Sequence, residues 1–294
     1  MKLGIDLGGT KIEIIALDDS GVELLRRRVA TPQGDYAATL QVITDLVHEV
    51  ETELQQQGTL GIGTPGAISR ATGLLKNSNS VCLNGQPILR DLEQLLGRSI
   101  RIQNDANCFA LSEAVDGAAA GLPVVFGVIL GTGVGGGIVI DGKTLNGVNA
   151  IAGEWGHNAL PWPCPDELSG AACYCGKTGC IETWLSGSGM ARHHAKTDWD
   201  AARIVAAAAA GDAACEHTLR VYEDRLARAL AQVINVLDPD AIVLGGGMSN
   251  IVRLYQNVPK LWSQYVFSDR VDTRLLRNLH GDSSGVRGAA WLWS

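Results

Sequence analysis

A carboxylate stands at a junction in the sequence where catalytic side chains are common. Asp105, in the run Asn104-Asp105-Ala106-Asn107, follows a short apolar stretch that predicts a strand and precedes an alanine-rich stretch that predicts a helix. From such a junction a carboxylate can project toward a ligand and accept the proton of an attacking hydroxyl. Asp is also favoured as the N-cap of a helix, so the position alone fits a general base and a capping residue equally well.

Three of the seven cysteines lie within eight residues of one another: Cys173, Cys175 and Cys180. With His157 upstream they provide the number and type of ligands for a closed tetrahedral zinc site, and Cys164 is an alternative fourth ligand. A closed site would organise the loop and would not act as a Lewis acid. The remaining cysteines are isolated and predict only small apolar residues: Cys82, Cys108 and Cys215.

Three apolar stretches end in glycine-rich turns that could hold phosphate groups: Gly8-Gly9-Thr10-Lys11, Gly131-Thr132-Gly133 and Gly245-Gly246-Gly247. Without a Cβ atom, the backbone N–H groups of such turns can approach anionic oxygens closely, while the threonines add hydroxyls and the lysine adds charge. Asp6, at the end of the first predicted strand, is placed to hold Mg²⁺ through water. Each turn alone could also be an ordinary tight turn. Neither a Walker A nor a GxGxxG pattern fits, because Gly8-Gly9 leads directly into another strand.

These residues need a framework, and the chain predicts one of the α/β class. The apolar stretches before Gly8 and Gly131 each continue through their turn into a second apolar run and an acidic-glycine turn, which indicates a duplicated β-hairpin. Residues 146–189, rich in Gly, Pro, Cys and Trp, predict loops. Further strands are predicted at residues 59–63, 100–103 and 241–244, and helices at residues 36–57, 106–120, 216–237, 250–264 and 285–293.

Length and charge narrow the class of function. The 294 residues (31.0 kDa) exceed what one core usually organises, which favours two lobes with a cleft between them. With 24 basic and 31 acidic residues the net charge is −7, which makes nucleic acid a poor partner and favours a small-molecule ligand. No apolar run approaches the ~18–20 residues of a membrane span, and Asp6 disfavours a signal peptide, so we expect a cytoplasmic protein.

Asp6-Leu7-Gly8-Gly9-Thr10-Lys11 resembles the first phosphate motif of the actin, heat-shock ATPase and sugar kinase superfamily. Together with Gly153-Glu154-Trp155-Gly156-His157 and the cysteine-rich run at residues 173–182, the chain resembles the ROK family (repressors, open reading frames and kinases) over essentially its whole length. The resemblance implies an α/β, actin-like and ribonuclease H-like, duplicated two-lobed sugar kinase fold. The expected lobes are residues 1–117, joined by a C-terminal helix at 283–294, and residues 118–282, which carry the zinc-binding loop.

The resemblance also implies roles for individual residues. It makes Asp105 the general base of an ATP- and Mg²⁺-dependent kinase, and it favours His157 over Cys164 as the fourth zinc ligand, with the second imidazole nitrogen free to meet a sugar hydroxyl. The chain begins directly at its first strand, without the helix-turn-helix of ROK repressors, which favours a kinase; a homodimer is expected. Sugar contacts are implied for seven residues: Gly66, Asn79, Asn104, Asp105, Glu154, His157 and Glu182.

The choice of sugar rests on two segments, residues 77–87 and 156–162, which look most like the bacterial fructokinase branch that also accepts mannose. They predict transfer of the ATP γ-phosphoryl group to the 6-hydroxyl of fructose. Cys82 departs from that branch, where a bulkier aromatic residue is expected. The N-acetylglucosamine kinases, similar over residues 104–110, and the glucokinases are the alternatives within the family. A non-catalytic ROK sugar sensor or a chaperone- or actin-like ATPase would be alternatives of another class.

Overall fold

The computed structural model describes residues 1–78, 80–194 and 198–293. The chain forms two compact units. The first unit contains Met1–Gly121, Gly137–Ala152 and Leu279–Ser294, and the second contains Leu122–Gly136 and Gly153–Asn278. The lobes expected at residues 1–117 and 118–282 stay a prediction.

The first unit is built on a five-stranded sheet with the strand order β3-β2-β1-β4-β7. The strands β1 and β2 form the predicted N-terminal hairpin, with Ile5 opposite Ile14, and β4 and β7 add parallel strands. Alternating apolar side chains such as Leu3, Ile5 and Leu7 are fully buried and supply the core of this unit. The strands span β1 Lys2–Leu7, β2 Lys11–Leu17, β3 Glu23–Ala30, β4 Thr59–Thr64 and β7 Arg101–Asn104, and β5 Ala67–Ile68 pairs with β6 Leu75–Lys76 in a separate small sheet.

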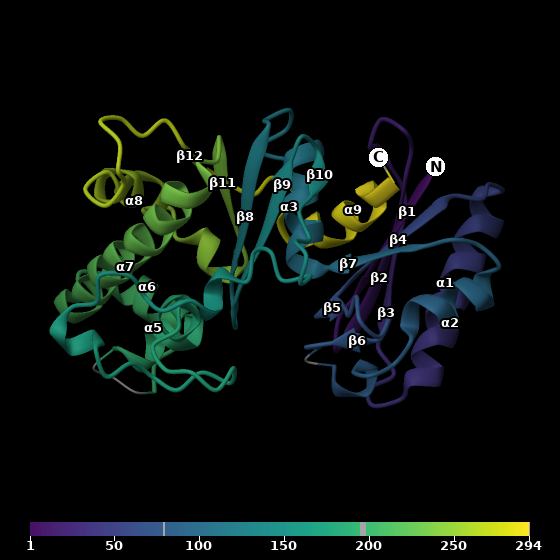
Figure 1. Cartoon of the computed structure of the whole chain (residues 1–294), viewed down its shortest axis with the longest axis horizontal. Helices are drawn as coiled ribbons and strands as arrows, with labels where there is room; N and C mark the ends of the chain where they lie inside the picture. The colour runs from purple at the N-terminus through teal and green to yellow at the C-terminus, as the bar shows by residue number, and fades with distance from the viewer. Residues whose placement is uncertain (79, 195–197, 294) are drawn as a thin grey trace. The chain divides into compact units, whose positions relative to one another are not determined.

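Helices cover both faces of the first sheet (Figure 1): α1 Tyr36–Leu54 and α2 Ile88–Leu96 lie on one face, and α3 Asp105–Val115 and α9 Ser284–Ala290 on the other. Two glycines allow α9 to approach β1 and β4 closely. A Cβ at Gly4 would lie 2.1 Å from the carbonyl oxygen of Val286, and one at Gly61 would lie 1.9 Å from that of Ala289. The C-terminal helix is therefore an integral layer of the first unit.

A second five-stranded sheet has the order β10-β9-β8-β11-β12 and repeats the hairpin of the first. The hairpin of β8 and β9 turns at Gly131–Gly133, as β1 and β2 turn at Gly8–Lys11, and β8 pairs in parallel with β11. The strands span β8 Val124–Leu130, β9 Val134–Ile140, β10 Lys143–Thr144, β11 Ala241–Gly245 and β12 Arg274–Arg277. The helices of the second unit are α4 Ile181–Leu185, α5 Gly187–Arg192, α6 Ala201–Ala209, α7 Ala213–Leu237 and α8 Leu254–Trp262. This repeat is the duplication predicted from the sequence.

Helix ends differ from the predicted ones for local reasons. The helix predicted at 36–57 ends at Leu54, because Gln55 adopts a left-handed conformation (φ 51°) that ends the hydrogen-bonded turns. The helix predicted at 216–237 begins earlier, at Ala213, because Asp212 accepts hydrogen bonds from two N–H groups of its first turn. Short 3₁₀ helices lie at Val81–Leu83, Trp155–His157, Pro165–Glu167, Gly247–Asn250, Gly281–Ser283 and Trp291–Trp293.

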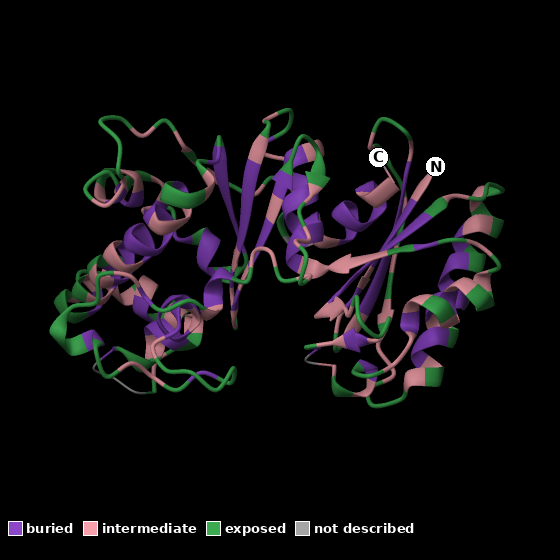
Figure 2. Ribbon diagram, viewed as in Figure 1, coloured by how far each residue is buried: buried purple, intermediate pink, exposed green. Residues whose placement is uncertain are grey.

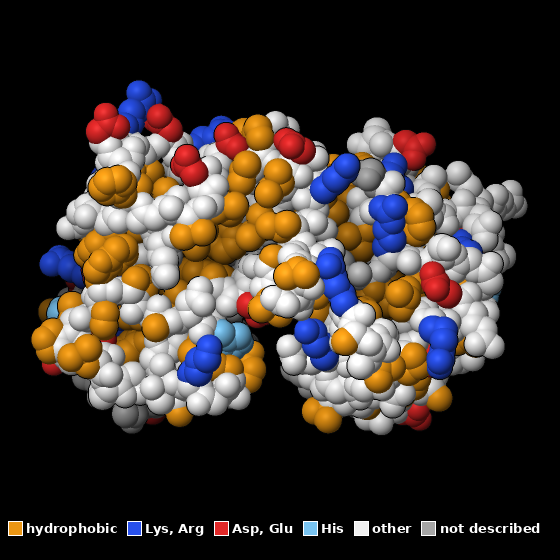
Figure 3. Space-filling model, viewed as in Figure 1, with side chains coloured by type: hydrophobic (Ala, Val, Ile, Leu, Met, Phe, Trp, Pro, Cys, Tyr) orange, Lys and Arg blue, Asp and Glu red, His pale blue; other side chains and the backbone are white. Residues whose placement is uncertain are grey.

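Burial follows the layers within each unit (Figure 2): the central strands and the helix faces turned toward them are buried. Apolar side chains are exposed over both units (Figure 3). The large apolar residues that are individually exposed include Val81, Val236 and Phe267. Single exposed apolar residues are common on protein surfaces and carry no argument for a partner. None of the helices formed by the described residues is both long and apolar enough to cross a bilayer.

Candidate functional site

Asp105 is the first residue of α3, directly after strand β7. The N-cap of this helix is Asn104, whose side-chain oxygen accepts the N–H of Ala106 at 2.9 Å. The capping role that the sequence left open for Asp105 thus belongs to Asn104, although an Asp105 oxygen also accepts the same N–H at 2.8 Å. The Asn104 amide donates to the carbonyl of Gly66 at 3.1 Å, so three of the predicted sugar-binding residues lie together in the first unit.

Gly66 has a backbone conformation that explains its residue type. Its φ is +86°, and a Cβ there would lie 2.3 Å from the carbonyl oxygen of Lys76 in β6. A larger residue would push apart the loop that Asn104 contacts. Asn79, another predicted sugar contact, lies outside the described residues.

A second carboxylate, Asp6 on β1, lies close to Asp105. Desolvation by the surrounding protein atoms, together with the negative charges of Asp105 and Glu13, raises the pKa of Asp6 to about 6, although the residue keeps some exposure. Glu13 faces Asp6 across the hairpin and is itself buried against Arg28, whose Nε donates to it at 2.9 Å. A divalent cation would stabilise the ionised form of Asp6, so this pair of carboxylates fits Mg²⁺.

The glycine turns occupy the ends of the central strands. In the first unit the turn at Gly8–Lys11 exposes Gly9 and Thr10, and the hydroxyl of Thr31 donates to the Gly8 carbonyl at 2.7 Å. In the second unit Gly246, with φ +78°, lies against the end of β8, where a Cβ would be 2.5 Å from the carbonyl oxygen of Leu130. The turns that contain Gly131, Thr132 and Gly133 and Gly245, Gly246 and Gly247 are therefore adjacent.

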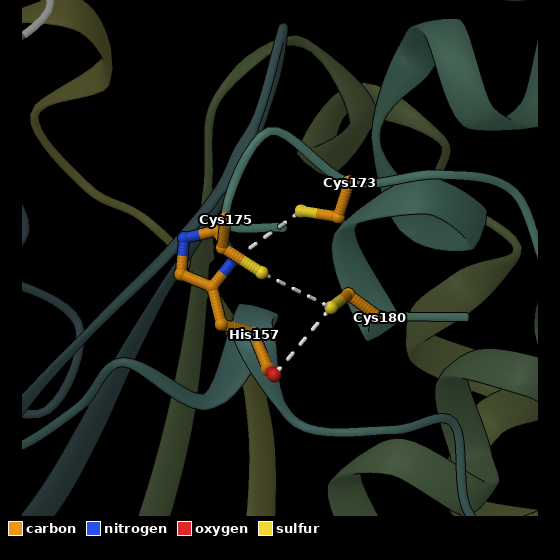
Figure 4. Close-up of side chains that lie close together, drawn as sticks. All are labelled: His157, Cys173, Cys175 and Cys180. Carbon is orange, nitrogen blue, oxygen red and sulfur yellow. Dashed lines mark hydrogen bonds between the residues drawn. The ribbon is translucent and has the colours of Figure 1, made fainter. Parts of the chain in front are cut away.

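The histidine and cysteine side chains predicted to bind zinc converge in the second unit (Figure 4). The ligand atoms of His157, Cys173, Cys175 and Cys180 all lie within 4.8 Å of one another. Cys173 Sγ is 3.5 Å from His157 Nδ1, and the sulfurs of Cys175 and Cys180 are 3.6 Å apart. All seven cysteines are free thiols, and Cys164, the alternative fourth ligand, is not part of the group.

A buried ion pair holds the loop that leads to these cysteines. Arg228 on α7 is almost fully buried and binds both carboxylate oxygens of Glu167, each at 2.9 Å, as well as the carbonyls of Pro161 and Trp162. Burial acts to raise the pKa of Glu167, but hydrogen bonds from Arg228 and Arg225 outweigh it and lower that pKa to about 2. The loop that carries His157 is thereby tied to the longest helix of the unit.

The two glutamates assigned to the sugar differ in their surroundings. Glu182 accepts the N–H of Val134 at 2.9 Å and lies 3.9 Å from the Cys173 sulfur, so it links the second glycine turn to the cysteine cluster. Glu154 is exposed, and its carboxylate makes no hydrogen bond to another described residue. Of the two, Glu154 is the carboxylate that is open to a ligand.

The predicted sugar contact of His157 stays a prediction, and the structure gives its imidazole a further partner. Its second nitrogen is not free, because the hydroxyl of Tyr174 lies 3.0 Å from Nε2 and the two rings meet edge to face at 5.0 Å between centroids. Tyr174 was not among the predicted site residues, although its position between Cys173 and Cys175 was a signal that could have marked it. Desolvation of the hydroxyl against the loop, with Glu182 and Glu154 nearby, raises the pKa of Tyr174 to about 12, although most of the ring is exposed.

Similar solved structures show which known fold this chain has. The ROK hexokinase from Thermus thermophilus is 30% identical with a TM-score of 0.88, covering 99% of this chain and 97% of that one. A ROK family glucokinase from Streptomyces griseus, solved with glucose and AMPPNP, is 27% identical with a TM-score of 0.76, covering 98% of this chain and 97% of that one. The fold is therefore the duplicated α/β fold of the sugar kinases, as predicted.

The sequence pattern of the ROK family matches residues 2–294. The chain is also 41% identical over 299 residues to an N-acetyl-D-glucosamine kinase from Yersinia pseudotuberculosis, an alignment that covers 99% of this chain and 98% of the relative. This protein belongs to the ROK family, as the resemblance of its motifs indicated.

Proposed function

We propose that this protein is an ATP-dependent N-acetylglucosamine kinase. The observation that carries the proposal is the 41% identity to the Yersinia pseudotuberculosis enzyme of that name, which spans 99% of this chain. It favours the alternative that the sequence analysis ranked behind fructokinase. The sugar kinase class itself is supported independently by the similar ROK hexokinase and glucokinase structures.

The segments that suggested fructose have packing roles. Trp162 stacks on Tyr265 at 5.3 Å between ring centroids, and the carbonyls of Pro161 and Trp162 bind the buried Arg228. Cys82 packs against the hydrophobic core of the first unit. Residues at these positions can be similar because they pack in the same way, whichever sugar is bound. Their similarity is therefore weak support for fructose as the substrate.

Asp105 is the proposed base for the transfer. Its carboxylate takes the proton of the sugar 6-hydroxyl, the hydroxyl oxygen forms a bond to the γ-phosphorus, and the bond from that phosphorus to the bridging oxygen breaks to leave ADP. A primary hydroxyl projects farthest from the ring and is the one best able to reach a single base. Mg²⁺ would supply charge neutralisation at the phosphates, with Asp6 holding it through water. The glycine turns at Gly8–Lys11, Gly131–Gly133 and Gly245–Gly247 are the proposed phosphate contacts.

We also propose that His157, Cys173, Cys175 and Cys180 bind one structural zinc ion. Ligand atoms held at zinc–ligand distances of ~2.0–2.3 Å lie about 3.5–3.8 Å apart around a tetrahedron. The distances of 3.5 Å between Cys173 Sγ and His157 Nδ1 and 3.6 Å between the Cys175 and Cys180 sulfurs fit that geometry. Four protein ligands leave no open position, so the ion would hold the loop and would not activate water.

A coupled assay of ADP release tests the function. With N-acetylglucosamine, glucose, mannose and fructose compared under one set of conditions, we expect kcat/KM to be highest for N-acetylglucosamine by about tenfold or more. A lead for fructose would restore the fructokinase hypothesis, and a lead for glucose would favour the glucokinases. ADP release without any sugar would indicate an ATPase, and no ADP release at all would indicate a non-catalytic sugar sensor.

A further inference from the structure

Tyr174 occupies a nitrogen that the sequence analysis left open to the substrate. In Figure 4 the imidazole of His157 turns one nitrogen toward the cysteine sulfurs and the other away from them. The hydroxyl of Tyr174, 3.0 Å from Nε2, covers that second nitrogen. A sugar hydroxyl approaching from this side would therefore meet the tyrosine before the histidine.

Of the hydrogen-bond donors of His157 and Tyr174, the Tyr174 hydroxyl is the one that can face a ligand. If a metal binds the lone pair of His157 Nδ1, which faces the cysteine sulfurs, the ring proton lies on Nε2 and can be donated to the Tyr174 oxygen. A tyrosine hydroxyl that accepts one hydrogen bond keeps its own proton to donate. Tyr174 is 83% exposed, and its hydroxyl makes no other hydrogen bond to a described residue, so that proton is available to a ligand.

The loop does not need this hydroxyl in order to fold. The turn around Tyr174 is closed by backbone hydrogen bonds from Cys173 N–H to the Lys177 carbonyl at 2.8 Å and from Gly176 N–H to the Cys173 carbonyl at 3.0 Å. Gly176, with φ +87°, supplies the left-handed residue of the turn. An exposed aromatic ring held edge to face on a histidine at the tip of such a turn has little structural reason to carry a hydroxyl.

We infer that Tyr174 is a specificity-determining residue, whose hydroxyl donates a hydrogen bond to an oxygen of the sugar while the N–H of His157 Nε2 orients it from behind. The inference rests on the proposed sugar kinase function. It pairs a donor with the exposed carboxylate of Glu154, three residues before His157, and a donor beside an acceptor is what recognition of a polyol requires. His157 becomes the residue that positions the donor, in addition to its place in the metal cluster.

The variant Tyr174→Phe tests the inference, because it removes one oxygen and keeps the ring. We expect KM for N-acetylglucosamine to rise about tenfold with kcat within about twofold, since the loss of a contact made equally in the ground and transition states raises KM alone. Zinc content and Tm should match the wild-type protein. The matched control is Tyr36→Phe, which removes a hydroxyl bonded to Asp91 at 2.9 Å in the first unit and should leave KM unchanged.

Two kinds of result overturn the inference. An unchanged or lowered KM in Tyr174→Phe would mean that the hydroxyl is idle or merely covers His157. A loss of zinc together with a fall in kcat would assign Tyr174 to the metal loop. If the wild-type protein prefers another hexose, the same comparison is made with that hexose, so failure of the N-acetylglucosamine proposal and failure of the Tyr174 inference are separate outcomes.

Discussion

At the scale of single residues, Asp105 is the side chain on which the proposed chemistry depends. Asp105→Asn keeps the shape and can still accept the N–H of Ala106, so α3 should begin at the same residue. The amide cannot accept the hydroxyl proton, and kcat should fall by about 10²–10⁴-fold while KM for the sugar changes little. Steady-state kinetics with a thermal melt as the folding control measure this. A variant that keeps most of its turnover would remove Asp105 from the role of base.

The raised pKa of Asp6 predicts how activity depends on pH. Below a pH of about 6 the folded protein holds Asp6 protonated, and a neutral carboxyl is a poor partner for Mg²⁺. We expect kcat/KM for Mg·ATP to decrease as the pH falls through about 6, because Asp6 becomes protonated in that range. Asp6→Asn should lower kcat/KM at pH 7.5 and flatten this acid limb. A wild-type profile that stays level down to pH 5 would contradict the prediction.

At the scale of elements, the loop between the 3₁₀ helix at Trp155–His157 and α4 depends on side-chain anchors, because few of its backbone hydrogen bonds belong to regular structure. We expect Cys175→Ser to lose the zinc ion, to lower Tm and to reduce kcat, since Glu182 and His157 would no longer be held by the cluster. Elemental analysis of protein purified without chelator measures the metal. The matched control is Cys164→Ser, an exposed thiol outside the cluster, which should keep zinc and Tm. Wild-type protein without zinc would refute the site.

At the scale of the whole molecule, the chain crosses between its units at residues 121/122, 136/137, 152/153 and 278/279. The fully buried carboxylate of Glu113 holds the chain beside two of these crossings. It accepts the N–H of Ala118 at 2.9 Å and of Leu279 at 3.1 Å, and its other oxygen accepts the hydroxyl of Ser284 at 2.8 Å. Donors from two parts of the sequence, Ala118 on one side and Leu279 and Ser284 on the other, thus share one acceptor group.

Glu113→Ala should lower stability by about 2 kcal/mol or more and Tm by several degrees, because two backbone N–H groups lose their acceptor and the buried hydroxyl of Ser284 keeps only the Gly281 carbonyl. Glu113→Gln should be milder, since its remaining oxygen can accept the two backbone N–H groups while Ser284 donates to the Gly281 carbonyl at 3.1 Å. Thermal melts measure both. Glu49→Ala removes an exposed ion pair with Arg27 in the same unit and should change stability by less than about 0.5 kcal/mol. Equal effects of the alanine variants at positions 113 and 49 would contradict the role of Glu113.

Features that depend on residues close together in the sequence could be predicted from the sequence alone. The two hairpins follow from apolar runs separated by glycine turns, and the convergence of Cys173, Cys175 and Cys180 follows from their spacing within one loop. Asp105 at the start of a helix was also visible, because a strand signal and a helix signal meet there. These features depend on interactions between residues a few positions apart, which a sequence records directly.

Contacts between distant residues were decided only by the tertiary structure. Whether His157 or Cys164 would complete the cysteine cluster, that Tyr174 would lie on the remaining histidine nitrogen, and that Glu182 would bind Val134 could not be derived from spacing. Each depends on how the second sheet, α7 and the Glu167–Arg228 ion pair place the loop. The burial that raises the pKa of Asp6 is likewise a property of packed layers. A sequence gives the chemical types, but only packing determines which groups are brought within hydrogen-bonding distance and removed from water.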